Sequence, residues 1–75
     1  MLNVNRFLKS LIGKDVIVKL KVGVIKCRIK DVLSEGSLVV DDIKVINTND
    51  NTLKLWEGKK NIVIRKDSVV GVFVE

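Results

Sequence analysis

Residues 61–74 have the sequence NIVIRKDSVVGVFV, and this stretch decides the fold. Two apolar runs flank the polar triplet Lys66-Asp67-Ser68, which predicts a tight turn between two strands. Successive positions of both runs are apolar, so both faces of each predicted strand need cover. An exposed edge strand of this kind in a small domain promotes aggregation. The pattern therefore predicts that these strands pair with another subunit.

The chain upstream of this stretch changes its hydrophobic period at Gly13. Residues 3–12 carry apolar side chains at helical spacing, which predicts a short amphipathic helix with Asn3 as its N-cap and Gly13 as its stop. After Gly13, β-branched residues alternate with polar ones and turn signals recur at short intervals. We therefore expect one mostly β domain over residues 1–75, in which a short N-terminal helix precedes a small all-β barrel or sandwich.

The alternation also predicts the strand positions. We expect strands at residues 15–21, from residue 24, at residues 37–46, from residue 53 to residue 65 with a bend at Gly58, and at residues 69–74. The alternation slips near Asp31 and is interrupted by Asp41-Asp42, which predicts a bulge or bend at each place. The polar residues 47–52 are expected to form a loop.

Composition limits the class of protein. The 75 residues are 47% hydrophobic and 31% charged, which is too apolar and too well patterned for a disordered chain. Fourteen basic residues against nine acidic ones give a net charge of +5, which suits a polyanionic partner or an acidic surface without choosing between them. No apolar run approaches the ~20 residues of a membrane helix, and no signal-peptide layout is present. We expect an intracellular, cytoplasmic protein that does not enter a membrane.

Residues suited to catalysis are scarce. The chain has no histidine, and its single cysteine, Cys27, alternates with core positions and lacks a base to activate it. A zinc site would have to be built from carboxylates. The adjacent Asp41 and Asp42 should point to opposite faces of a strand, and the five glycines are scattered singly rather than in a phosphate loop. The sequence therefore predicts a protein that is not an enzyme and has no cofactor.

Basic residues line one face of two expected neighbouring strands. They are Lys19 and Lys21 on the first strand and Lys26, Arg28 and Lys30 on the second. Such a stripe could follow a phosphate backbone, or it could be a solvated face that keeps the strands soluble. The sequence alone leaves both interpretations open.

Trp56 shares a face with Lys54 next to the polar loop. Its ring could stack on a base or could pack on a loop or on another subunit. Packing is the commoner role for a tryptophan in this setting, and we favour it.

On these residues the chain resembles the Sm and Sm-like proteins, especially the compact archaeal ones, over nearly its whole length. Residues 13–21 (GKDVIVKLK) are similar to that family's first strand, and residues 62–70 (IVIRKDSVV) are similar to its second Sm motif. The resemblance implies an N-terminal helix on a strongly bent, SH3-like barrel of five antiparallel strands. It also implies a homo-oligomeric ring of six or seven subunits, in which strand four pairs with strand five of the neighbour.

The resemblance further implies that uridine-rich single-stranded RNA binds at the inner rim of the ring. The family's RNA-binding positions fall on Glu35, Ser37, Arg65, Lys66 and Asp67. Arg65 and Asp67 match the second motif, whereas Lys66 replaces its glycine. Glu35 and Ser37 replace the aromatic or histidine and the asparagine of the first motif. Negative charge at Glu35 opposes phosphate and base carbonyls, which predicts a weaker preference for uridine. The resemblance therefore supports the ring more strongly than the RNA pocket.

Arg65 follows an apolar run and precedes the tight turn. In that setting its planar guanidinium could stack on a base and bond a phosphate. Alternatively, it could pair with Asp67 or with a carboxylate of a neighbouring subunit and only stabilise the turn.

Three functions remain open from the sequence. The first is a non-catalytic ring that binds single-stranded RNA as a scaffold or chaperone. The second is a structural or protein-binding ring on the same fold, in which the RNA pocket has decayed. The third is a monomeric SH3-like module that binds a peptide, and the apolar last strand argues against it.

Overall fold

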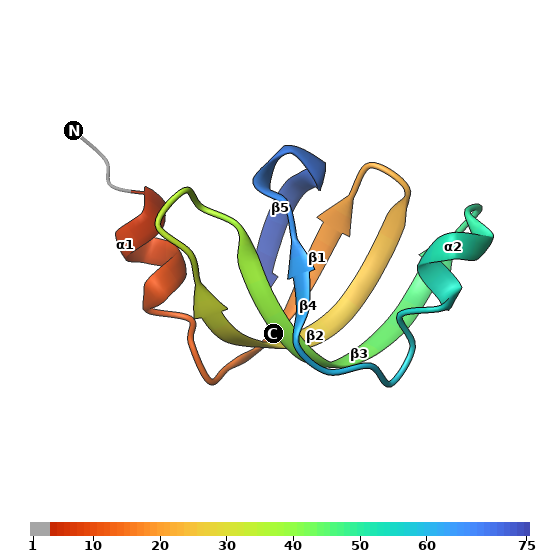
Figure 1. The fold of residues 1–75 in the computed structure, drawn as a ribbon, viewed down its shortest axis with the longest axis horizontal. Helices are drawn as coiled ribbons and strands as arrows, with labels where there is room; N and C mark the ends of the chain where they lie inside the picture. The colour runs from red at the N-terminus through yellow and green to blue at the C-terminus, as the bar shows by residue number, and fades with distance from the viewer. Residues whose placement is uncertain (1–3) are drawn as a thin grey trace.

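The computed structural model describes residues 4–75, which form a curled half-barrel of five antiparallel strands with three short helical segments (Figure 1). The elements are α1 (Val4–Lys9), β1 (Asp15–Leu20), β2 (Gly23–Val32), β3 (Leu38–Thr48), α2 (Asn51–Lys54), β4 (Ile62–Ile64), the 3-10 helix η1 (Lys66–Ser68) and β5 (Val69–Val74). The strand order is β4-β3-β2-β1-β5. The prediction of a mostly β chain with five antiparallel strands is confirmed. No helix within residues 4–75 is long and apolar enough to cross a membrane.

The curvature of the sheet comes from β2 and β3. Their pairing shifts register at three places, between Val24 and Ile25, around Cys27, and between Ile29 and Asp31. On β3, Asp42 has a positive φ of 53°, which breaks the extended conformation there. Bulges increase local twist, so these two long strands fold over and enclose the core on the concave face. The bends predicted near Asp31 and at Asp41-Asp42 are confirmed. The expectation that Asp41 and Asp42 point to opposite faces is wrong, because the positive φ of Asp42 breaks the alternation and both carboxylates pair with cations of β2, Asp41 with Lys30 and Asp42 with Arg28.

The core consists of the alternate residues that point into the half-barrel. The buried hydrophobic residues are Leu11, Val16, Val18, Leu20, Ile25, Cys27, Ile29, Val32, Leu38, Val40, Ile43, Leu53 and Ile64. Cys27 is among them, as its alternation predicts, and burial raises the pKa of its thiol to about 12. A thiol with that pKa remains protonated at neutral pH and is a poor nucleophile.

The expected helix at residues 3–12 is shorter in the structure, and its expected N-cap Asn3 lies outside the described residues. The helix α1 ends at Lys9 because the Ser10 hydroxyl donates to the Phe7 carbonyl and competes with helical hydrogen bonding. The chain then tightens into a turn that buries Leu11. Gly13, at a φ of +86°, donates its N–H to the Ile29 carbonyl at 2.7 Å and leads into β1.

The prediction that a fourth strand begins near Leu53 is wrong, because a short helix, α2, occupies this segment. The Asp50 carboxylate caps α2 by accepting from the Thr52 N–H at 2.8 Å. Leu53 on this turn is only 2% exposed, so the helix is held by its contact with the core. The fourth strand, β4, is limited to Ile62–Ile64.

The segment after α2 closes the free edge of β3 beyond β4. The Gly58 N–H donates to the Ile43 carbonyl at 2.9 Å, and the Val45 N–H donates to the Glu57 carboxylate at 2.6 Å. Within residues 4–75, the outer edges of β4 and β5 therefore remain uncovered.

Gly23 is the point of closest approach between the β1–β2 hairpin and the end of β3. A Cβ atom there would lie 2.3 Å from the Asn47 carbonyl oxygen and 2.9 Å from carbon atoms of Thr48 and Leu53. The Thr48 hydroxyl also donates to the Val22 carbonyl at 2.8 Å, which fixes the hairpin against β3. No side chain fits at this position without separating the strands.

We therefore predict that Gly23→Ala lowers the free energy of unfolding by about 2–3 kcal/mol, the upper range for overpacking, because the clash is with backbone. Urea unfolding at a fixed protein concentration measures it. Gly71→Ala is the matched control, since its Cβ would only touch the Phe73 ring at 3.4 Å, and we expect a change below about 0.5 kcal/mol. Equal losses in the two variants would show that Gly23 is not sterically required.

Candidate functional site

A groove of about 580 Å³ opens between α1, the turn after β2 and the segment that follows β4. It is lined by Leu8, Ser34, Glu35, Gly36, Leu38, Lys66, Val69 and Val72. The lining is apolar on the side of α1 and β5, and it carries one negative and one positive side chain, Glu35 and Lys66. Two turns that are far apart in the sequence thus meet at one groove.

The predicted site residues divide into three groups in the structure. Glu35 and Lys66 line the groove together. Arg65 and Asp67 flank Lys66 and are exposed, but they do not line the groove. Ser37 is only 5% exposed, and its carbonyl accepts from the Leu33 N–H at 2.8 Å at the neck of the turn. Ser37 therefore holds the turn closed and does not present its side chain to the groove.

The η1 turn holds its charged side chains outward on a rigid backbone. The Ser68 N–H donates to the Arg65 carbonyl at 2.9 Å, which closes the turn. Within residues 4–75, no ion pair or side-chain hydrogen bond involves Arg65, Lys66 or Asp67. The internal Arg65–Asp67 pair, one of the two ways in which this arginine could merely stabilise the turn, is thus not formed in this part of the chain.

Most carboxylates of the chain are engaged elsewhere. Of the nine acidic residues, four form ion pairs and three others accept from backbone N–H groups. Among the described residues, the two that remain without a partner are Glu35 and Asp67. Unneutralised charge of both signs therefore gathers around η1, where Arg65 and Lys66 are also unpaired.

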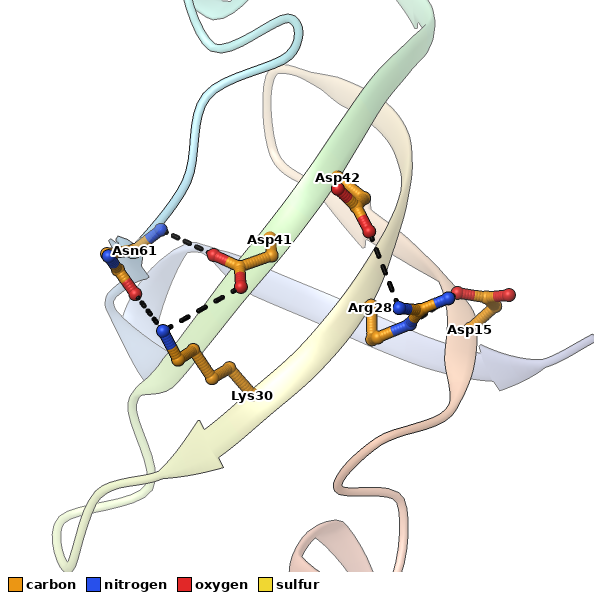
Figure 2. A network of polar contacts seen from close by, with 6 residues as sticks. All are labelled: Asp15, Arg28, Lys30, Asp41, Asp42 and Asn61. Atoms are coloured by element: carbon orange, nitrogen blue, oxygen red, sulfur yellow. Dashed lines mark hydrogen bonds and ion pairs between the residues drawn. The ribbon is translucent and has the colours of Figure 1, made fainter.

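The convex face of β2 carries a network of ion pairs (Figure 2). Arg28 lies between the carboxylates of Asp15, at 3.3 Å, and Asp42, at 3.6 Å. Lys26 lies two positions before Arg28 on β2 and pairs with Glu75 at 2.8 Å. The hydrogen bond to Glu75 raises the pKa of Lys26. These cations face carboxylates, which offset their charge and reduce their attraction for a phosphate backbone.

Lys30, the third basic residue of the stripe on β2, belongs to a second cluster in the same view (Figure 2). Lys30 donates to the Asn61 side-chain oxygen at 2.7 Å and lies 3.9 Å from the Asp41 carboxylate. The other oxygen of Asp41 accepts from the Asn61 backbone N–H at 2.6 Å. The three residues fix the chain just before β4. The convex stripe of Lys26, Arg28 and Lys30 is therefore better explained as an ion-paired face of the sheet than as a nucleic-acid surface.

Asn61 is the residue of this network that sequence reasoning missed. Its φ of 56° is in the left-handed region, which asparagine tolerates better than most residues. An asparagine immediately before an apolar strand was the available signal, but its partners lie 20 and 31 residues away in the chain.

The backbone N–H of Trp56 donates to the Leu53 carbonyl at 3.0 Å, and the partly buried Trp56 side chain packs against the core. This contact agrees with the packing interpretation of Trp56. Within residues 4–75, no three histidine, cysteine or acidic side chains gather closely enough to hold a metal ion.

No protein-family model matches the chain, and a search of curated proteins finds no match either. The fold and the groove therefore carry what can be inferred about function.

The Asp41 cluster gives a stability test. We predict that Asp41→Ala lowers the free energy of unfolding by about 1–3 kcal/mol, because it removes a hydrogen bond from the Asn61 N–H to a charged acceptor together with the ion pair to Lys30. Asp41→Asn keeps an acceptor oxygen and should cost less. Urea unfolding compares both with Asp42→Asn, which removes only an exposed ion pair and should cost under about 1 kcal/mol. A larger loss in Asp42→Asn than in Asp41→Ala would contradict this ranking.

Proposed function

We propose that the chain is a non-catalytic RNA-binding protein of the Sm-like class, which assembles into a ring and acts as a scaffold or chaperone for single-stranded RNA. The observation that carries the proposal is the strand order β4-β3-β2-β1-β5, which leaves two apolar edge strands open. The groove next to η1 supports the choice of ligand.

The two edge strands favour assembly. Each of β4 and β5 pairs with another strand on one side only. Val63 on β4 and Val70, Phe73 and Val74 on β5 are all more than half exposed. Pairing of β4 in one subunit with β5 in the next would satisfy the unpaired backbone groups and cover these side chains. Such a contact joins two different surfaces, so it closes into a ring when the rotation between subunits allows it. The family resemblance suggests six or seven subunits.

The η1 turn favours RNA as the ligand. Arg65 is exposed and unpaired within residues 4–75, and its guanidinium can stack on a base while it bonds a phosphate. Lys66 adds a second cation at the groove. Glu35, which also lines the groove, opposes the base carbonyls that uridine presents, so we expect little preference for uridine over adenine and a strong dependence on salt.

A structural or protein-binding ring is the second candidate. Glu35 is unpaired in the groove, and the cations of the convex face are neutralised by carboxylates. Both observations reduce the attraction for a polyanion while they leave the edge strands unchanged. Assembly into a ring and binding of RNA therefore have to be measured separately.

Assembly is tested by placing a charge on an edge strand. We predict that the protein has the mass of a ring at micromolar concentration and that Val63→Glu raises the concentration at which the ring dissociates at least about tenfold, because the charge would be buried without a partner. Analytical ultracentrifugation gives the mass. We choose Val63 on β4 and not Val72 on β5, because Val72 packs against the core of its own subunit.

Leu55→Glu is the matched control. Leu55 is 70% exposed and follows α2, at the end of the half-barrel opposite α1 (Figure 1). The control should leave the mass unchanged. A wild-type protein that sediments as a monomer, or a ring that Val63→Glu does not weaken, would remove the ring from the proposal.

RNA binding is tested at Arg65. We predict that Arg65→Lys weakens the binding of labelled oligo-U and oligo-A about tenfold or more while the particle mass stays the same, because lysine keeps the charge but loses the planar stacking surface. Fluorescence anisotropy measures the affinity. Arg28→Lys, on the ion-paired convex face, should change it less than about twofold.

Unchanged affinity in Arg65→Lys would exclude this residue from the site. A lost ring would instead assign Arg65 to assembly. If the unmodified ring binds neither oligonucleotide, the protein-binding ring becomes the better candidate.

A further inference from the structure

A second, smaller hollow of about 240 Å³ lies at the tip of the β1–β2 hairpin, against the end of β3. It is lined by Lys19, Lys21, Val22, Gly23, Val24, Asn47, Thr48 and Asn49, and we call it the hairpin cleft. No acidic residue contributes to this lining. The hairpin cleft therefore differs from the groove, whose lining includes Glu35.

The polar side chains of the hairpin cleft are available to a ligand. Lys19 and Lys21 are exposed, and neither forms an ion pair within residues 4–75. The side-chain amides of Asn47 and Asn49 have no hydrogen-bond partner in this part of the chain either. Two ammonium groups and two amides can bond phosphate oxygens, ribose hydroxyls and base edges.

The backbone of the hairpin cleft is fixed before any ligand binds. The Thr48 hydroxyl donates to the Val22 carbonyl at 2.8 Å and accepts from the Asp50 N–H at 2.9 Å. Gly23 fits against Asn47 with no room for a side chain. A preformed cleft of this kind loses little conformational entropy when it is occupied.

The hairpin cleft and the groove lie on either side of one junction. The Lys21 N–H donates to the Ser68 carbonyl at 3.1 Å, and Leu20 of β1 pairs with Val69 of β5. Val69 lines the groove, whereas Lys21 lines the hairpin cleft. Figure 1 shows the β1–β2 hairpin and η1 on the same side of the half-barrel. A single strand of RNA that crosses η1 next to Arg65 would therefore meet Lys21 next.

We propose that the hairpin cleft is a second binding site for the same single-stranded RNA, which receives the phosphate backbone of the nucleotides next to those held at η1. Lys19 and Lys21 neutralise phosphates, and Asn47 and Asn49 bond sugars or base edges. This inference rests on the proposed RNA-binding function and extends the path of the RNA beyond the groove.

The test uses the assembled protein and two oligoribonucleotides of mixed sequence, one of about four and one of about 15 nucleotides, which span the usual range of single-strand sites. Lys19→Gln/Lys21→Gln should weaken the longer oligonucleotide about tenfold or more and the shorter one less than about twofold. Each phosphate contact contributes about 0.7 to the slope of log affinity against log salt, so the slope should fall by about 1.4.

Lys44→Gln/Lys60→Gln is the matched control, because these lysines are also exposed and unpaired within residues 4–75 but do not line the hairpin cleft. It removes the same charge and should weaken the longer oligonucleotide less than about threefold. Particle mass is checked for both double variants.

The outcomes separate the two proposals. If the unmodified ring binds neither oligonucleotide, the RNA-binding function fails and this inference fails with it. If both bind, and the two double variants lose equal affinity for the longer one, the function stands and the hairpin cleft is excluded. A glutamate-rich peptide that binds the unmodified ring more tightly than the longer oligonucleotide, and loses affinity only in Lys19→Gln/Lys21→Gln, would overturn the assignment to RNA in favour of an acidic protein.

Discussion

The bend in β2 and β3 is the constraint on which the rest of this structure depends. A single five-stranded sheet can enclose a core only if it curls over itself, and the register shifts of β2 with the positive φ of Asp42 produce that curl. The convex face is then held by charge. Arg28 bridges Asp15 and Asp42, and Asp41 holds the backbone of Asn61. Exposed ion pairs contribute at most about 1 kcal/mol each, so the backbone hydrogen bond to Asp41 is the strongest of these restraints.

The same bend determines which parts of the sheet remain free. It brings η1 against the β1–β2 hairpin, where Lys21 bonds Ser68, and it leaves β4 and β5 as the two ends of the strand order. The segment after α2 covers the exposed edge of β3, but nothing within residues 4–75 covers the outer edges of β4 and β5. Because β5 follows β4 directly through η1, a partner that pairs with either strand would lie close to the unpaired charges of Arg65 and Lys66. Assembly and ligand binding would therefore be neighbours on the same surface.

The sequence predicted the features that depend on local pattern. The turn at Lys66–Ser68 and the strand at Val69–Val74 followed from a polar triplet between apolar runs, and the burial of Cys27 followed from alternation. The helix at Asn51–Lys54 was missed because Leu53 fits both a strand and a helix, and only its contact with the core decides between them. The retreat of Ser37 into the neck of its turn could not be predicted, since the spacing of a motif does not show which side chain the turn buries.

The sequence also could not show which charges neutralise one another. A net charge of +5 suggests a generally basic surface, but the structure removes Lys26, Arg28 and Lys30 from that surface by pairing them with acids. What remains is divided by η1. On one side, the groove combines an apolar lining with one unpaired carboxylate, Glu35, and one unpaired ammonium group, Lys66, so its charges balance and the setting suits the uncharged ring of a base. On the other side, the hairpin cleft presents lysines and amides with no acid in its lining, a setting that attracts phosphate. A single strand of RNA carries its bases and its phosphates on opposite sides of the sugar, so a surface sorted in this way would orient the strand as well as bind it.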